Sequence, residues 1–125
     1  MAKTIDYEFK RGETYPLKKF RILDKNKNVI QLTDTEQLYF TVKADNNTRE
    51  ALFQKKINRG IELGDDGYYH ITIEPADTNN LDYGTYTYDI QLKSTGSKTI
   101  VKTLFDGTIT LTEETTWEVN EWVKE

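Results

Sequence analysis

The chain has 125 residues, no cysteine and two prolines, and its formal net charge is −4 with acidic and basic residues interspersed. This length fits one domain that buries its core without disulfides, and the lack of cysteine excludes thiolate metal sites and thiol nucleophiles. Interspersed charge argues against a nucleic-acid-binding face, and no apolar stretch has the length of a signal peptide or of a membrane span (~18 residues), so we expect a soluble protein with neither nucleic acid nor membrane as partner.

Apolar and polar residues alternate along most of the chain, which is the period of a β-strand rather than of a helix. In chain order the alternating sets are Ile5, Tyr7 and Phe9; Phe20 and Ile22; Leu38, Phe40 and Val42; Ala51, Phe53 and Ile57; Tyr69, Ile71 and Ile73; Tyr86, Tyr88, Ile90 and Leu92. The last run puts Val101, Thr103, Phe105, Gly107, Ile109 and Leu111 on one face, with a bulge or bend predicted at Asp106-Gly107.

Turn-favouring residues separate these runs at positions 11–12, 24–28, 45–47, 65–67, 79–80 and 94–97. Short strands at this spacing are typical of a two-layer β protein. We therefore predict an all-β fold, an immunoglobulin-like antiparallel β-sandwich of about seven to eight strands, over residues 1–114.

Two segments depart from the β pattern. Residues 74–81 carry Pro75 at a position suited to the first turn of a helix, which predicts a short helical crossover between the sheets. Residues 115–125 carry a capping box, Thr115-x-x-Glu118, and place Val119, Trp122 and Val123 at helical spacing. This carboxy-terminal arm is expected to be a short helix or an extended segment.

The segment Asp82-Tyr-Gly84-Thr-Tyr86-Thr-Tyr88 matches a tyrosine corner, in which a tyrosine near the start of a strand donates its hydroxyl to the backbone a few residues upstream. Tyr86 is the predicted corner residue, and Gly84 allows the tight turn into the strand. Tyr88 takes the buried position that holds a cysteine in antibody domains. We interpret both tyrosines as structural, with a ladder for stacking sugars or bases as the alternative.

Several segments are similar to one known family: Phe9-Lys-Arg-Gly-Glu13, Leu32-Thr33, Phe53-Gln-Lys-Lys56, Ile73-Glu-Pro-x-Asp77-Thr78 and Leu111-Thr-Glu-Glu114. Through them, residues 7–115 resemble the small immunoglobulin-like domain of tail and baseplate proteins in phages and prophages of Gram-positive bacteria, the class of the amino-terminal domain of baseplate upper proteins. The resemblance implies a virion structural protein assembled in the bacterial host cytoplasm. None of these segments is a catalytic signature.

Residues that could support chemistry are few. His70 is the sole histidine, and one imidazole cannot supply the ligands of a zinc site, so an exposed or hydrogen-bonded strand histidine is expected. The turn 24–28 imitates half a calcium loop but has Val29 and Thr35 where that loop needs glycine and glutamate. A metal or a carboxylate pair would require Asp65, Asp66, Asp77 and Asp82 to meet at one end. We predict no catalytic, cofactor-binding or metal-binding residue and no enzyme activity.

Interface candidates lie at the two ends of the chain. Trp117 and Trp122, with Val119 and Val123, belong to the acidic arm, and large aromatic residues are enriched at interface hot spots. The alternative is that the arm folds back over its own core. Ile5 and Tyr7 are candidates for edge-strand contacts. The cations Lys18, Lys19, Arg21, Lys25, Lys27, Lys55, Lys56 and Arg59 are expected on solvated strand faces, with a charged docking face as the alternative.

These observations favour a non-enzymatic phage or prophage adaptor of a tail, neck or baseplate. It would assemble with other virion subunits, and with copies of itself, through edge strands and terminal arms. The runner-up is a carbohydrate- or host-surface-binding module, which needs an exposed aromatic platform from Tyr68 and Tyr83, or from Tyr86 and Tyr88.

Overall fold

The structure is a computed structural model that describes residues 2–24, 26–30, 32–45, 47, 49–95 and 99–113. It contains the helix α1 (Pro75–Thr78) and strands β1 (Lys3–Thr4), β2 (Tyr7–Lys10), β3 (Tyr15–Pro16), β4 (Ile22–Leu23), β5 (Val29–Ile30), β6 (Glu36–Lys43), β7 (Phe53–Ile57), β8 (Gly60–Leu63), β9 (Tyr69–Ile73), β10 (Gly84–Thr95) and β11 (Thr99–Thr112). The predictions of an all-β fold and of a short helical crossover are confirmed.

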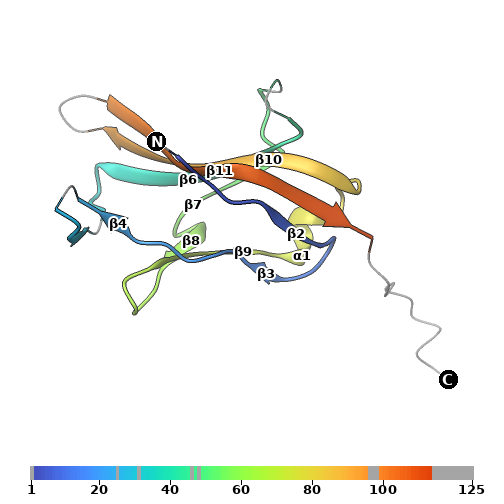
Figure 1. Ribbon diagram of the computed structural model, residues 1–125, viewed down its shortest axis with the longest axis horizontal. Coiled ribbons are helices and arrows are strands. Elements are labelled where there is room, and N and C mark those ends of the chain that lie inside the picture. Colours follow the sequence, from blue (N-terminus) through green and yellow to red (C-terminus); the bar gives the residue numbers. More distant parts are fainter. Residues whose placement is uncertain are drawn as a thin grey trace.

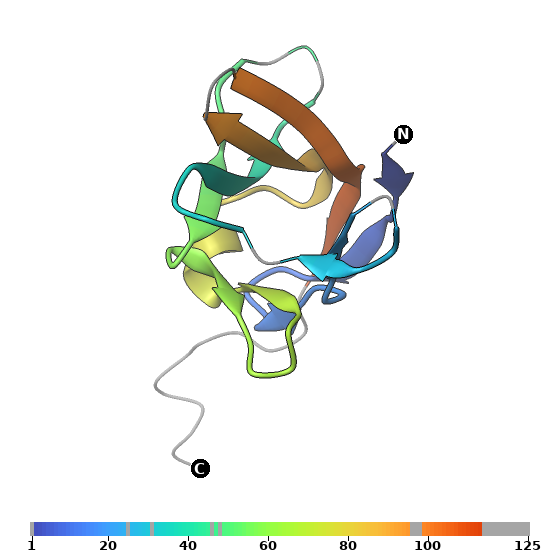
Figure 2. The same cartoon turned by 90° about the vertical axis from the view of Figure 1, so that its left-hand side faces the viewer.

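The strands form one curled sheet in the order β1-β11-β10-β6-β7-β8-β9-β3, with β2 also on β11, while β4 and β5 make a separate hairpin. The sheet curls so that β6, β10 and β11 lie over β3, β8 and β9 (Figure 1), and the end view shows the strands around a common interior (Figure 2). Among the described residues, no helix is both long and apolar enough to cross a membrane.

The sheet is mixed, so the predicted antiparallel pairing holds for most strand pairs but not for all. β1 and β2 run parallel to β11, and β7 runs parallel to β8. Alternation along a strand predicts which side chains face inward, but it carries no information about the partner strand or its direction.

The core lies between the two layers and consists mostly of the predicted inward residues. Its most deeply buried apolar members are Leu38, Phe40, Val42, Ile61, Ile71, Ile73 and Leu111. The Phe9 and Tyr15 rings stack at 4.4 Å between centroids, which joins β2 to β3 and closes the curl. Ala51, predicted to face inward, is exposed, because β7 begins only at Phe53.

The long hairpin of β10 and β11 contains one bulge. Ile90 lies opposite Phe105 and Gln91 opposite Thr103, so Leu104 is the extra residue, and the bulge predicted at Asp106-Gly107 is misplaced. An extra residue reverses which side chains face inward. Val101 is exposed while Ile109 and Leu111 are buried, so the predicted single face for this run is wrong; Ile100, of the opposite parity, is exposed as well.

Gly107 allows the first strands to lie close against β11. Its φ is +152°, and a Cβ at this position would overlap the carbonyl oxygen of Ile5. The Ile5 amide donates to the Asp106 carbonyl at 2.9 Å, and the Tyr88 hydroxyl donates to the Ile5 carbonyl at 2.6 Å. Glycine at 107 thus leaves the space in which both hydrogen bonds form.

Lys55 points into the protein, although it was predicted to lie on a solvated face. It is only 8% exposed, lies opposite Phe40, and brings its Nζ within 2.8 Å of Asp77 Oδ2 in α1. Asp77 also accepts from the Glu74 amide at 2.7 Å, closing a capping box. The prediction failed because a lysine is buried when a carboxylate from a distant segment neutralises it.

Tyr86 makes the hydrogen bond that a tyrosine corner requires. Its hydroxyl donates to the Asp82 carbonyl at 2.6 Å, across the turn that leads into β10 through Gly84 at φ +141°. Tyr88 is buried, and its phenol packs 5.6 Å from the Phe40 ring. Burial raises the pKa of Tyr88 well above its ordinary value, so the phenol stays neutral and keeps donating to Ile5.

Tyr86→Phe should lower the free energy of unfolding by about 1 kcal/mol, because it removes one hydrogen bond and leaves the ring in place. Urea denaturation followed by circular dichroism measures the change. Tyr39→Phe is the matched control, since the Tyr39 hydroxyl makes no hydrogen bond to any described residue. Equal stabilities of the two variants would contradict the structural role of Tyr86.

Candidate functional site

Two predicted interface residues, Ile5 and Tyr7, hold the amino-terminal strands to the sheet of their own chain. Tyr7 pairs with Ile109, its ring lies 5.8 Å from the Tyr88 ring, and its hydroxyl accepts from the Lys18 amide at 3.2 Å. Burial raises the pKa of Tyr7 above its ordinary value. The other predicted interface residues lie outside the described residues: Trp117, Val119, Trp122 and Val123.

An apolar groove lies where the β4–β5 hairpin approaches the β10–β11 hairpin. We call it the β4–β11 groove; its volume is about 310 Å³, and its apolar lining consists of Ile22, Leu23, Ile30, Leu92, Leu104 and Phe105. Leu23 is 45% exposed and Ile30 is 37% exposed. Figure 1 places β4 near the end of the molecule that is opposite the end of β11.

The rim of the β4–β11 groove is cationic. Its charged lining residues are Lys3, Arg21 and Lys102, and no carboxylate belongs to the lining among the residues that the structure describes. An adjoining hollow of about 180 Å³ shares Lys3 and Phe105 and adds Lys18 and Lys19. An apolar surface with such a rim suits a partner that is itself apolar and acidic.

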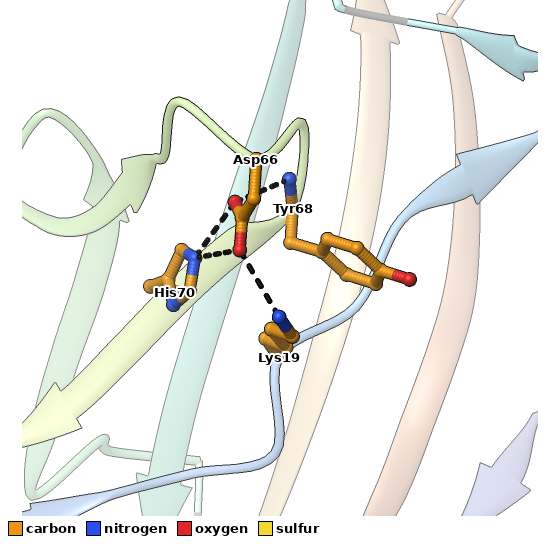
Figure 3. Close-up of polar contacts among 4 residues, drawn as sticks. All are labelled: Lys19, Asp66, Tyr68 and His70. Carbon is orange, nitrogen blue, oxygen red and sulfur yellow. Dashed lines mark hydrogen bonds and ion pairs between the residues drawn. The ribbon is translucent and has the colours of Figure 1, made fainter.

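Asp66 organises a polar cluster beside this region (Figure 3). Its carboxylate lies 3.1 Å from Lys19 Nζ and 3.1 Å from His70 Nε2, and it accepts from the Tyr68 amide at 3.0 Å. The hydrogen bonds from His70 and the Tyr68 amide hold the pKa of Asp66 well below its usual range. His70 is thus the hydrogen-bonded strand histidine that was predicted, and the cluster connects the β8–β9 turn to the segment before β4.

The two tyrosines proposed as a stacking platform each carry a cation over the ring. Lys19 Nζ lies 4.4 Å and Arg21 Cζ 4.8 Å from the centroid of Tyr68. Arg11 Cζ lies 4.4 Å from the centroid of Tyr83, and Arg11 Nη1 donates to the Leu81 carbonyl at 3.1 Å. A sugar stacking on these rings would compete with cation–π contacts already made.

Three of the four aspartates considered for a metal site enter separate interactions. Asp66 binds Lys19 and His70, Asp77 binds Lys55, and the Asp82 backbone carbonyl accepts from Tyr86. Within the described ranges, no three His, Cys, Asp or Glu side chains gather closely enough to hold a metal ion.

A polar hollow of about 250 Å³ lies on the outer face of β6, β10 and β11. It contains Asp89 and Asp106, which are directly opposed across the hairpin, and also Lys43. Burial is the main cause that raises the pKa of Asp89; Asp106 raises it further and Lys43 lowers it. Two facing carboxylates on a partly buried surface are a local source of repulsion.

Asp89→Asn should stabilise the protein by about 0.5 kcal/mol at pH 7. The pKa of the Asp89 carboxyl is higher in the folded than in the unfolded state, so the folded state favours the protonated carboxyl. The ionised carboxylate therefore lowers the free energy of unfolding, and this loss develops as the pH rises from the unfolded-state pKa through the folded-state pKa. The gain should therefore vanish near pH 3, where the carboxyl is protonated in both states. Thermal melts from pH 3 to pH 7 test this, with Glu8→Gln as control, since Glu8 is an exposed residue of β2. A gain of equal size at both ends of the range would contradict it.

The β4–β11 groove was not predicted from the sequence. Its one local signal was the placement of apolar residues on both sides of the polar turn 24–28, namely Ile22-Leu23 and Val29-Ile30. Ile22 pairs with Ile30 and Leu23 with Val29, and only Ile22 of these four side chains is buried, so apolar surface of the hairpin remains available to a partner.

No protein-family model matches the chain, and no curated protein sequence matches it significantly.

Proposed function

We propose that this chain is a non-enzymatic structural protein of a phage or prophage virion, an adaptor in a tail, neck or baseplate. Its fold would be an immunoglobulin-like β-sandwich, and it would join neighbouring subunits through edge strands and terminal arms. The proposal combines the sequence resemblance with three properties of the molecule: the corner hydrogen bond of Tyr86, the two-layered curled sheet and the surface of the β4–β11 groove.

The β4–β11 groove is the observation that carries the proposal. Single exposed apolar side chains are common on soluble proteins, whereas a group of them in a groove marks an interaction site. Leu23 and Ile30 are exposed in this groove, which a rim of lysine and arginine surrounds. In a ring of identical subunits one such contact repeats at every interface, so modest individual affinities produce a stable assembly.

The test is whether the protein is part of a particle. Particles released by inducing the source strain can be purified by density gradient, and peptides of this chain quantified by mass spectrometry against those of the tail proteins. We expect the chain to co-purify at a fixed ratio to a ring-forming tail component. Its absence from purified particles, with the soluble chain present in the lysate, would refute the proposal.

The carbohydrate-binding alternative has less support. Lys19 and Arg21 lie over the Tyr68 ring and Arg11 lies over the Tyr83 ring, so neither ring offers a free platform on that side. Titration with host cell-wall polysaccharide, followed by calorimetry, separates the two functions, because an adaptor should give no heat of binding. Saturable binding that Tyr83→Ala abolishes would favour the alternative.

A further inference from the structure

We propose that the β4–β11 groove binds the carboxy-terminal arm, residues 115–125, of a second copy of this chain, with Trp117 as the anchoring side chain. This deepens the proposed adaptor role, on which it rests for the expectation that copies of the chain meet. In this contact one copy supplies the arm and the other copy supplies the β4–β11 groove.

The chemistry of arm and groove is complementary. The arm carries Glu118, Glu121 and Glu125 against the single Lys124. Its apolar residues are Trp117, just before the first of these charges, and Val119, Trp122 and Val123 among them. The groove offers the opposite charge around an apolar lining, since Lys3, Arg21 and Lys102 are its charged residues. A volume of about 310 Å³ accommodates an indole ring. Such a contact buries a large aromatic side chain centrally and leaves ion pairs at the edge.

The length of the arm determines which copy supplies Trp117. Leu104 lies eight residues before Thr112, the end of β11, which is a distance of ~26 Å along a strand. Trp117 follows Thr112 by five residues. A reversal at the end of β11 uses at least two of these, and the remaining three span at most ~11 Å. Trp117 therefore cannot return to the groove of its own chain, and the acceptor is another copy.

The arm leaves the end of β11, whereas the groove lies near its beginning, so the arm and the groove are different surfaces of one subunit. Two copies that exchange arms reciprocally would form a two-fold dimer, and arms passed from each copy to the next would form a ring or a filament. Each subunit then offers one arm and one groove to its neighbours.

The two tryptophans of the chain both lie in the arm, so tryptophan fluorescence of the full-length protein reports on the arm alone. As the protein concentration rises, we expect the emission of the Trp122→Phe variant, which keeps Trp117, to shift to shorter wavelength. Acrylamide quenching of Trp117 should fall in parallel, and the mass measured by light scattering should rise. Salt should weaken all three effects, since it screens the charged rim.

Leu23→Asp should weaken the association at least about tenfold, because it places a carboxylate inside the groove that receives the acidic arm. Leu52→Asp is the matched control: Leu52 is 43% exposed, similar to Leu23, and does not line the groove. It should associate like the parent protein. Circular dichroism and thermal melts verify that both variants fold.

Three results would overturn the proposal: emission that does not respond to concentration, equal association of the Leu23→Asp and Leu52→Asp variants, or blue-shifted emission in a monomer at every concentration. The last result would place the arm on its own chain. None of them bears on the presence of the protein in purified particles, so the proposed function and this contact fail independently.

Discussion

Gly107→Ala should destabilise the protein by about 2–4 kcal/mol, the sum of overpacking and an unfavourable backbone conformation. A methyl group at this position would overlap the backbone carbonyl of Ile5, which cannot yield as a flexible side chain would. Moving Ile5 away breaks its hydrogen bonds with Asp106 and Tyr88. We expect β1 and the start of β2 to detach from β11, and hydrogen exchange should locate the loss of protection there.

Gly84→Ala is the matched control for this experiment. Gly84 has φ +141°, close to that of Gly107, but a Cβ at position 84 meets nothing within 4 Å. It therefore carries the cost of the backbone conformation without the overlap. Urea denaturation of both variants separates the two contributions, and equal losses at both positions would show that the close approach of Ile5 contributes nothing.

Asp77→Ala should lower the free energy of unfolding by about 3 kcal/mol. The substitution leaves the Lys55 ammonium buried without its partner and also removes the acceptor for the Glu74 amide. Lys55→Met should cost less, because methionine retains most of the packing against Phe40 and Asp77 still caps α1. Urea denaturation at pH 7 measures both variants.

The double variant tests the coupling between Lys55 and Asp77. With the buried charge gone, Asp77→Ala should cost about 1–2 kcal/mol less in the Lys55→Met background than in the parent. The exposed pair Lys19–Asp66 provides the comparison, since Lys19→Met should change stability by less than about 1 kcal/mol. Additive effects of the Lys55 and Asp77 substitutions would contradict a buried ion pair.

Much of the fold was predictable because its signals are local. Alternation identified the inward residues of β6, β9 and β10, Pro75 marked α1, and the spacing from Asp82 to Tyr86 anticipated their hydrogen bond. The alternation follows from the pleat of a β-strand, the start of α1 from the fixed φ of proline, and the Tyr86 hydrogen bond from a spacing of four residues. A few neighbouring residues determine each of these features.

The features that escaped prediction depend on distant partners. Lys55 is buried because Asp77 lies beside it, and the bulge at Leu104 depends on how β11 pairs with β10. The β4–β11 groove combines residues of β4, β5, β10 and β11, which only the three-dimensional arrangement brings together. Alternation within one strand cannot encode such a juxtaposition.

The parallel pairing of β2 with β11 also constrains how the protein is made. The Thr108 amide donates to the Asp6 carboxylate, a contact between residues 102 positions apart in the chain. A nascent chain still on the ribosome has no partner for β2 until the codons for β11 have been read. Folding must therefore finish after nearly all of these residues have left the exit tunnel, and a message truncated before β11 should give a product that cellular proteases remove.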